Sequence, residues 1–352
     1  MKVLVIGGSG YIGGHTVEEL VGRGHEVSVF ARGHTRPRLL EDVRFIKGDR
    51  HNPDDLSELR SHGFEAVIDI NAYTREETQA AISTFDGRVS RFVHLSTASV
   101  YQITGNMPLV ESDPLVTDPG ATYAYNKAEC ERALRWAYTK NGFPFVSVRP
   151  GVVFGPRDNK SRENYYLKRI ISGDPVIVAD SGALPIFAVY VKDLAVSLAN
   201  ALTATGAEGN AYHLMQSEIV AIHAHIANIA RLAGADAEVT EVPSRLLERV
   251  GFNLRQIPYH ANGRLILCDT SAARADLAFS PTPYPRALKD TITYFLEHDP
   301  ENHPSIEDRF PPVLPRSRER ALTERFRAGI RALEDNLTDD WLDEAITGLS
   351  ER

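Results

Sequence analysis

The chain opens with an apolar run of mostly branched side chains, Val3–Ile6, which is typical of a strand covered on both faces of a sheet. Glycines then recur at every third position, at Gly7, Gly10 and Gly13. The stretch from Tyr11 to Arg23 predicts a helix that ends before Gly24, and a second apolar strand is predicted at Val27–Phe30. Strand, turn, helix and strand occupy about 30 residues, which is the size of one βαβ unit.

Apolar strands and helices continue to alternate through the first half of the chain. Further strands are predicted at Val43–Lys47, Ala66–Ile70, Phe92–Ser96 and Phe145–Arg149. Helices are predicted between them at Asp54–Ser61, Arg75–Thr84 and Thr122–Asn141. This rhythm predicts an α/β fold, a Rossmann doubly wound parallel sheet with a smaller C-terminal substrate-binding lobe.

The rhythm loosens after Arg149, which suggests a change of domain. We expect residues 1–208 to form the dinucleotide-binding Rossmann domain, with 151–190 partly contributing to the substrate lobe. Residues 209–298 are expected to form mainly the substrate-binding lobe, and 299–352 a Pro-rich linker and C-terminal helices. Two charged amphipathic helices are predicted at Arg316–Glu334 and Asp339–Leu349. A solvated polar face is the default interpretation, and packing against the lobe or self-association are the alternatives.

Charge and composition narrow the class of protein. The 352 residues carry a net charge of −8, which opposes nonspecific attraction to nucleic acid or to an anionic membrane. No apolar stretch reaches the ~20 residues of a membrane span, and the first residues already form a predicted strand rather than a signal peptide. Cys130 and Cys268 are expected to be buried thiols, and the protein is expected to be cytoplasmic with no metal site.

The glycine turn predicts a site for a dinucleotide. Gly7, Gly10 and Gly13 would allow a tight turn, close approach of a pyrophosphate and close packing of helix on strand. The helix that follows directs its unsatisfied N–H groups and the positive end of its dipole at the phosphates. The spacing G-x-x-G-x-x-G differs from the common G-x-G-x-x-G, and an ordinary structural turn is the alternative.

Two further patterns carry hydroxyl and amine chemistry. Tyr123 and Lys127 stand one helical turn apart on the same face, and a nearby ammonium favours the phenolate form of a tyrosine. Ser96 and Thr97 fall at the carboxyl end of a predicted strand, where open α/β sheets bind ligands. The alternatives are an ordinary surface pair for the first pattern and a strand-end cap for the second.

Together, these patterns resemble the extended short-chain dehydrogenase/reductase family, of the NAD-dependent epimerase/dehydratase type, from residue 1 to about 296. Other stretches that match the family are Gly48–Arg50, Arg149–Pro156, Val191–Ala195 and Asp269–Leu277. The resemblance implies an NAD(P)(H)-dependent oxidoreductase. It would transfer hydride at a secondary alcohol or ketone of a sugar-like or polyhydroxylated metabolite.

The resemblance also implies residue roles. Tyr123 is expected as the general acid/base, Lys127 as its activator and ribose anchor, and Thr97 as the hydroxyl that orients the substrate. Asp49 is expected near the adenine, and Asn71 on the nicotinamide side. The full set of expected cofactor contacts is Gly7, Ser9, Gly10, Tyr11, Ile12, Gly13, Ala31, Arg32, Asp49, Arg50, Asn71, Ala72, Ser96, Lys127 and Pro150.

One departure from the family bears on the cofactor. Epimerases of the UDP-galactose 4-epimerase type end their second strand with an Asp that binds both ribose hydroxyls, where this chain has Ala31 and then Arg32. A guanidinium pairs with a 2′-phosphate that a carboxylate would repel, so NADP(H) is favoured over NAD(H). Arg36 and Arg38 are close enough in sequence to assist, and a plain surface cation is the alternative for Arg32.

Other departures bear on the substrate. Ala98-Ser99 replaces the Asp-Glu pair of the 4,6-dehydratases, which disfavours elimination of water. Val152 and Ile186-Phe187 replace polar residues that hold a nucleotide diphosphate, which puts a UDP- or TDP-sugar substrate in doubt. The basic residues that could substitute are Arg157, Lys160, Arg255 and Arg264.

Several functions stay open at this point. The leading one is a reductase or dehydrogenase for a small-molecule substrate, and the alternative is a (nucleotide-)sugar epimerase that retains its NAD. An RNA-binding protein, as in the chloroplast stem-loop-binding relatives, or a cofactor sensor is a third class. The net charge of −8 and the intact Tyr-x-x-x-Lys argue against RNA, so no nucleic-acid or membrane partner is expected and a homodimer is possible.

Overall fold

The computed structural model describes residues 1–33, 42–102, 105, 107–158, 161–260, 265–298, 300, 302–310 and 314–336. The chain divides into two compact units, which interleave along the sequence. Unit 1 comprises Met1–Asn159, Ile186–Ile219 and Ala261–Tyr294. Unit 2 comprises Lys160–Pro185, Val220–His260 and Phe295–Arg352.

Unit 1 is built on a seven-stranded parallel sheet in the order β11-β6-β5-β4-β1-β2-β3. Its strands are β1 (Lys2–Ile6), β2 (Glu26–Ala31), β3 (Arg44–Lys47), β4 (Ala66–Asp69), β5 (Arg91–Leu95), β6 (Phe145–Pro150) and β11 (Ala211–Leu214). The strand order reverses between β1 and β4, and such a switch point is where a doubly wound sheet binds its ligand. The predicted Rossmann fold is confirmed.

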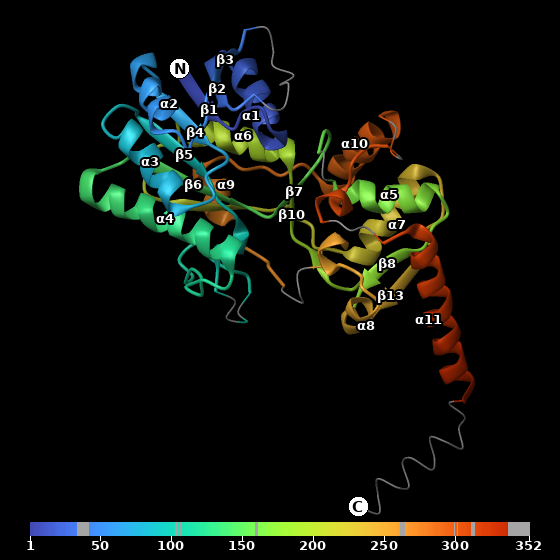
Figure 1. The fold of residues 1–352 in the computed structure, drawn as a ribbon. Coiled ribbons are helices and arrows are strands. Elements are labelled where there is room, and N and C mark those ends of the chain that lie inside the picture. Colours follow the sequence, from blue (N-terminus) through green and yellow to red (C-terminus); the bar gives the residue numbers. More distant parts are fainter. Residues whose placement is uncertain are drawn as a thin grey trace, which may run out of the picture. The chain divides into compact units, whose positions relative to one another are not determined.

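Helices cover both faces of this sheet (Figure 1). Val3 and Val5 of β1 belong to one apolar cluster with residues of α1 (Tyr11–Gly22) and α6 (Val191–Ala201). Leu4 and Ile6 belong to the opposite cluster, with residues of α2 (Pro53–Glu58), α3 (Arg75–Phe85) and α4 (Thr122–Asn141). This alternation explains why β1 is apolar at every position from Val3 to Ile6, because a strand buried on both faces has no solvent side.

Several smaller elements complete the part of the chain that the structure describes. The short strands are β7 (Val152–Phe154), β9 (Pro185–Ile186), β10 (Ala188–Tyr190) and β12 (Val220–Ala221). The remaining helices outside unit 2 are η1 (Leu59–His62), η2 (Ala98–Val100) and α9 (Ser271–Asp276), and α10 (Tyr284–Glu297) runs across the division between the units. No helix among the described residues is long and apolar enough to cross a membrane.

Unit 2 contains a parallel strand pair, β8 (Val176–Ala179) and β13 (Val239–Val242). Its helices are α5 (Arg162–Ile171), α7 (Ile222–Ala233), α8 (Ser244–Arg249), η3 (Leu254–Gln256), η4 (Ile306–Arg309) and α11 (Arg316–Asn336). The fully buried Arg169 of α5 donates to Glu319 at 2.8 and 3.1 Å and to Glu307 at 2.8 Å, which fastens α11 and η4 to α5. The predicted helix Asp339–Leu349 lies outside the described residues.

Candidate cofactor and catalytic site

The glycine turn between β1 and α1 is sterically constrained. Gly7 has φ of +84°, which L side chains rarely adopt, and a Cβ there would lie 3.0 Å from Cγ of Asn71. A Cβ on Gly13 would lie 2.3 Å from the carbonyl oxygen of Gly7, so only glycine lets α1 pack this closely on the turn. Among the described residues, a Cβ on Gly10 would meet only that same oxygen, at 3.5 Å, which leaves open space beyond Gly10 in this part of the structure.

The N-terminus of α1 fits an anion. Gly10 is the N-cap, it provides no side-chain cap, and the first turn contains no acidic residue. The first N–H groups of a helix need an acceptor from outside the helix, and here the open space beyond Gly10 lies beside them. Ser9, Tyr11 and Ile12 are half-buried around this opening. The cradle therefore fits the diphosphate of a dinucleotide.

At the end of β2, Ala31 is half-buried and Arg32 is exposed. Beyond β3, Asp49 accepts hydrogen bonds from the backbone N–H of His51 at 3.0 Å and from its ring Nδ1 at 2.8 Å. These bonds lower the pKa of Asp49, and the charge of Arg32 acts in the same direction. Neither Arg36 nor Arg38 lies among the described residues.

Arg50 has a structural environment. Its guanidinium is buried and donates to both carboxylate oxygens of Asp69, at 2.8 and 3.0 Å, and to the carbonyl of Glu77 at 3.2 Å. It also donates to Oδ1 of Asn71 at 2.9 Å, which holds that amide against the glycine turn. A role of Arg50 in cofactor binding would therefore be indirect, through the position of Asn71.

Lys127 is held by neutral acceptors. Its ammonium donates to the carbonyls of Ala72 at 2.8 Å and Leu95 at 2.5 Å, and lies 3.4 Å from Nε2 of His94. Burial of this side chain, which is only 2% exposed, lowers the pKa of Lys127. The ammonium is thus fixed between the carboxyl ends of β4 and β5, at the edge of the sheet where ligands bind.

Tyr123 lies one turn before Lys127, in the first turn of α4, and is 53% exposed. The ring of Tyr73, which follows Ala72, lies 5.8 Å from the ammonium of Lys127 and is also exposed. Helix α4 therefore carries an exposed tyrosine one turn before a buried lysine, which is the arrangement that the Tyr-x-x-x-Lys spacing predicts.

The two hydroxyls at the end of β5 have different surroundings. Ser96 is buried and donates to the carboxylate of Glu131. Thr97 is half-buried, and its Oγ1 accepts from the N–H of Ser99 at 3.2 Å to cap η2. No acceptor for the hydroxyl hydrogen of Thr97 is found among the described residues, whereas Ser96 donates into the protein interior.

Ser96 leads into a buried network that our sequence reasoning missed. Glu131 accepts from Nε of Arg149 at 2.9 Å, and the guanidinium of Arg149 donates to the hydroxyl of Tyr101. This hydroxyl lies 2.5 Å from Nε2 of His213. Burial raises the pKa of Tyr101, which keeps its phenol protonated. The one sequence signal was that Glu131 lies four residues after Lys127, on the same helical face.

The remaining candidate residues either pack against or pair with other groups of the protein, or lie outside the described residues. Pro150 is buried at the end of β6, and the N–H of Val152 donates to the carbonyl of Phe187 at 2.7 Å. Arg157 pairs with Glu18, and the guanidinium of Arg255 lies 4.5 Å from the ring of Phe310. Lys160 and Arg264 lie outside the described residues.

Comparison with known proteins supports the fold and the family. The family model described as NAD dependent epimerase/dehydratase family matches residues 3–214. Two solved structures share the fold. The UDP-glucose 4-epimerase of Thermotoga maritima with UDP-glucose has a TM-score of 0.72 and 19% identity, covering 85% of this chain and 99% of that one. The UDP-glucose 4-epimerase of Thermus thermophilus, in complex with NAD, has a TM-score of 0.68 and 23% identity, covering 84% and 99%.

Three curated relatives differ in their described functions. The chloroplast stem-loop binding protein of 41 kDa b from Arabidopsis thaliana is 29% identical, over 57% of this chain and 55% of its own length. A UDP-glucose 4-epimerase of Lactobacillus helveticus is 31% identical, over 49% and 61%. A 2′-dehydrokanamycin reductase of Streptomyces kanamyceticus is 28% identical, over 61% and 61%. The chain thus spans only 55% to 61% of the length of these three relatives.

Proposed function

Because this chain belongs to the NAD dependent epimerase/dehydratase family, we propose that unit 1 binds a nicotinamide dinucleotide and that the protein transfers hydride at a carbinol or ketone carbon. The family match confirms the predicted resemblance to the extended short-chain dehydrogenases/reductases, a family of enzymes. The observation that carries the proposal is the buried ammonium of Lys127, fixed by two carbonyls one turn from the exposed phenol of Tyr123.

The glycine turn and the N-terminus of α1 fit a diphosphate, and this indicates which residues would hold the dinucleotide. The N–H groups at the start of α1, from Tyr11 to Gly13, would bind the diphosphate. Lys127 would hold the ribose hydroxyls, with Asn71 and Ala72 beside the nicotinamide. The bound nicotinamide supplies the site that accepts or gives up the hydride.

The protein's own residues move the proton. Tyr123 takes the proton of the substrate hydroxyl during oxidation and returns it during reduction. The charge of Lys127 favours the ionised form of that phenol, because an opposite charge nearby stabilises a phenolate. Thr97 donates its hydroxyl hydrogen to the same substrate oxygen and so fixes its orientation.

Among reactions of this type, we propose a net reduction or oxidation of a sugar-like metabolite. The support is the set of departures at Val152 and Ile186-Phe187, where apolar residues stand in place of those that hold a nucleotide diphosphate. The 2′-dehydrokanamycin reductase shows that the relatives include a reductase. An epimerase is the second candidate, favoured by the UDP-glucose 4-epimerase relative and by the solved epimerases of the same fold.

The nucleotide that co-purifies with the protein separates the two candidates. We would denature the purified full chain and identify the released nucleotide by mass spectrometry. A reductase should release none, should bind NADPH reversibly and should consume it with a ketone substrate. Stoichiometric NAD that survives gel filtration, with no net consumption of cofactor, would replace the reductase by the epimerase.

The preference for NADP(H) is part of the proposal and rests on Arg32, which is exposed directly after β2. The Thermus thermophilus neighbour is a complex with NAD, so the choice needs a direct test. Arg32→Ala should weaken NADPH binding by about 10- to 150-fold and leave NADH binding unchanged, since a charge-assisted pair to phosphate contributes about 1.5–3 kcal/mol. The matched control is Arg44→Ala on β3, also an exposed arginine.

Isothermal titration of both dinucleotides measures this preference. Wild-type protein that binds NADH at least as tightly as NADPH would contradict it.

RNA is the alternative partner to exclude, because one relative is named a stem-loop binding protein. Salt-dependent retention of RNA on a filter by protein that binds neither dinucleotide would overturn the enzymatic proposal.

A further inference from the structure

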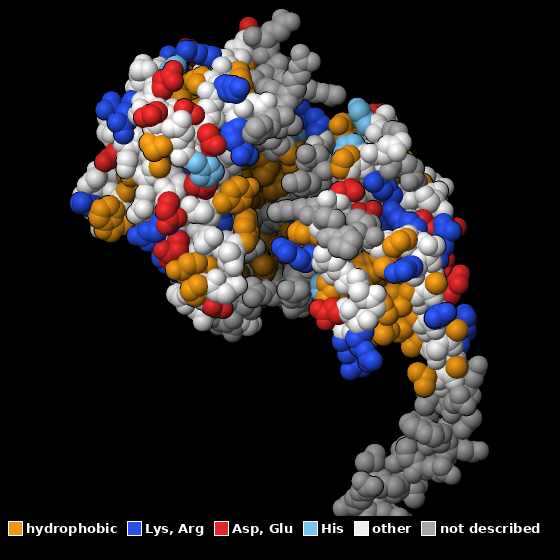
Figure 2. Space-filling model, in the orientation of Figure 1, with side chains coloured by type: hydrophobic (Ala, Val, Ile, Leu, Met, Phe, Trp, Pro, Cys, Tyr) orange, Lys and Arg blue, Asp and Glu red, His pale blue; other side chains and the backbone are white. Residues whose placement is uncertain are grey.

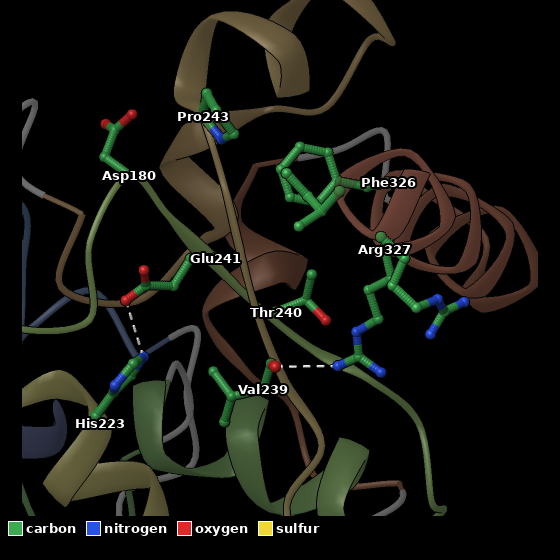
Figure 3. A pocket seen from close by; sticks show the side chains of 10 residues that line it. Asp180, His223, Val239, Thr240, Glu241, Pro243, Phe326 and Arg327 are labelled. Carbon is green, nitrogen blue, oxygen red and sulfur yellow. Dashed lines mark hydrogen bonds and ion pairs between the residues drawn. The ribbon is translucent and has the colours of Figure 1, made fainter. Parts of the chain in front are cut away.

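Unit 2 contains a cavity of about 620 Å³ (Figure 3). It lies between the edge of β13 that does not pair with β8 and the C-terminal half of α11. It is lined by Asp180, His223, Val239, Thr240, Glu241, Pro243, Phe326, Arg327, Ile330 and Arg331. None of these residues belongs to the candidate catalytic site.

The walls of the cavity combine apolar and polar groups. Figure 3 shows Phe326 and Arg327 of α11 facing the strand that carries Val239 and Thr240. Arg327 donates to the carbonyl of Val239 at 3.0 Å, so α11 already bonds to part of this strand edge. Thr240 is 5% exposed, and its hydroxyl has no hydrogen-bond partner among the described residues. A buried hydroxyl without a partner indicates that a further group completes this site.

The apolar face of α11 continues beyond the cavity. Leu322 and Phe326 pack against the apolar cluster of unit 2. Ile330 and Leu333 extend the same face but are 40% and 63% exposed. Figure 2 shows apolar side chains gathered along this helix. A stripe that begins in the core and ends in solvent is typical of a helix with a missing neighbour.

The chain's own sequence provides a segment of matching chemistry. Residues 339–349 read Asp-Asp-Trp-Leu-Asp-Glu-Ala-Ile-Thr-Gly-Leu, with apolar residues at the spacing of a helix face. The segment carries four acidic residues and no basic one, whereas α11 carries six arginines against four acids. Among the described residues, no ion pair is formed by Arg331, at the mouth of the cavity.

We propose that the segment 339–349 docks on this cavity within the same chain, antiparallel to α11. A turn directly after Asn336 would bring Leu342 level with Leu333, Ile346 with Ile330 and Leu349 with Phe326. The same register places Asp343, which flanks this apolar face, on the side of Arg331. Because the segment begins a few residues after α11 ends, its effective concentration at the cavity is high without any added affinity.

Trp341 makes the proposal directly measurable, because the chain has only two tryptophans. In the full-length Trp136→Phe protein, Trp341 is the sole fluorophore of this kind. We expect Trp341 to emit at a shorter wavelength than in the denatured protein and to be protected from quenching by iodide. Both properties should be independent of protein concentration. Ile330→Asp should shift the emission to longer wavelength and remove the protection. Val250→Asp, at an equally exposed apolar residue of unit 2, should not.

A charge exchange controls for simple misfolding. Arg331→Glu should expose Trp341, and Arg331→Glu combined with Asp343→Arg should restore its protection, while Arg318→Glu on the first turn of α11 has no effect. Solvent-exposed Trp341 in the parent protein would overturn the proposal. Protection that disappears on dilution would also overturn it, in favour of docking between two copies of the chain. So would protection that Ile330→Asp leaves unchanged, since the segment would then lie elsewhere.

Discussion

Lys127 of unit 1 and Arg169 of unit 2 are both buried cations, yet their partners differ in charge. Arg169 is enclosed by two carboxylates, of Glu307 and Glu319, and lies 3.5 Å from the ring of Tyr165. Among the described residues, the ammonium of Lys127 contacts two neutral carbonyls and the ring of His94, whose pKa burial lowers well below its usual range. Burial acts to lower the pKa of Arg169, but the two carboxylates outweigh it and raise the pKa, whereas burial lowers the pKa of Lys127.

The difference shows how a buried cation that stabilises the fold can be distinguished from one that acts on a ligand. A cation whose charge is offset by carboxylates attracts an anionic ligand little, and it serves to join the segments that supply its partners. A cation held by carbonyls keeps its positive charge while its position is fixed, so it can act on a phenol or a ribose nearby. The following variants test this distinction, from the largest expected effect to the smallest.

Tyr123→Phe should lower turnover by ~10²–10⁴, because it removes the group that we propose moves the proton while leaving the helix unchanged. Circular dichroism and dinucleotide binding should match those of the wild type. Tyr138→Phe, another exposed tyrosine of α4, is the matched control and should leave the rate as it is. A turnover of Tyr123→Phe near the wild-type value would remove Tyr123 from the mechanism.

Arg169→Met should destabilise the protein by ~3–5 kcal/mol, because Glu319 then stays buried with no ion-pair partner among the described residues, while Glu307 keeps only Arg316. Denaturant unfolding of the full chain measures this change. Arg318→Ala, at an exposed arginine of α11, should stay within about 0.5 kcal/mol. An equally small effect of Arg169→Met would show that the carboxylates find other partners and that the charge cluster is not what fastens α11.

Acid should weaken the protein through His225. This ring is buried beside Glu163 at 3.7 Å, and burial lowers the pKa of His225 to about 4. The unfolded chain binds the proton at higher pH than the folded one, so stability falls as the pH drops from about 6.5 toward 4, by at most roughly 3 kcal/mol. His225→Phe should flatten this part of the stability profile, measured by unfolding at each pH. If the substitution left the slope of stability against pH unchanged, other titrating groups would account for the loss of stability in acid.

Lys127→Met should lower turnover strongly but change the free energy of unfolding less than Arg169→Met does. Methionine removes the cost of burying a charge, which stabilises the fold, but it also removes the hydrogen bonds to Ala72 and Leu95, which destabilises it. The two effects partly cancel in the free energy of unfolding. Parallel measurements of turnover and unfolding for both variants complete the comparison. A stability loss for Lys127→Met as large as that for Arg169→Met would make Lys127 a structural residue.

Local patterns predicted much of unit 1 correctly. The helix Thr122–Asn141 has the predicted bounds, and the helix from Tyr11 ends one residue earlier than predicted. The predicted helix Asp54–Ser61 is instead a short α2 followed by the 3₁₀ turn η1. Such ends are set by a few neighbouring side chains, such as Asn52, which caps the start of α2.

The sequence by itself determined the features that depend on near neighbours along the chain. These are the glycine turn, where a Cβ would clash, and the shared face of Tyr123 and Lys127, which follows from the helical repeat. Only the tertiary structure decided which partners distant residues meet. Ser96 bonds to Glu131, Arg149 reaches Tyr101, and Arg50 is committed to Asp69, because folding brings strand ends and helix faces together across tens of residues. A buried polar group takes whichever partner the packing provides, and no local pattern specifies that partner.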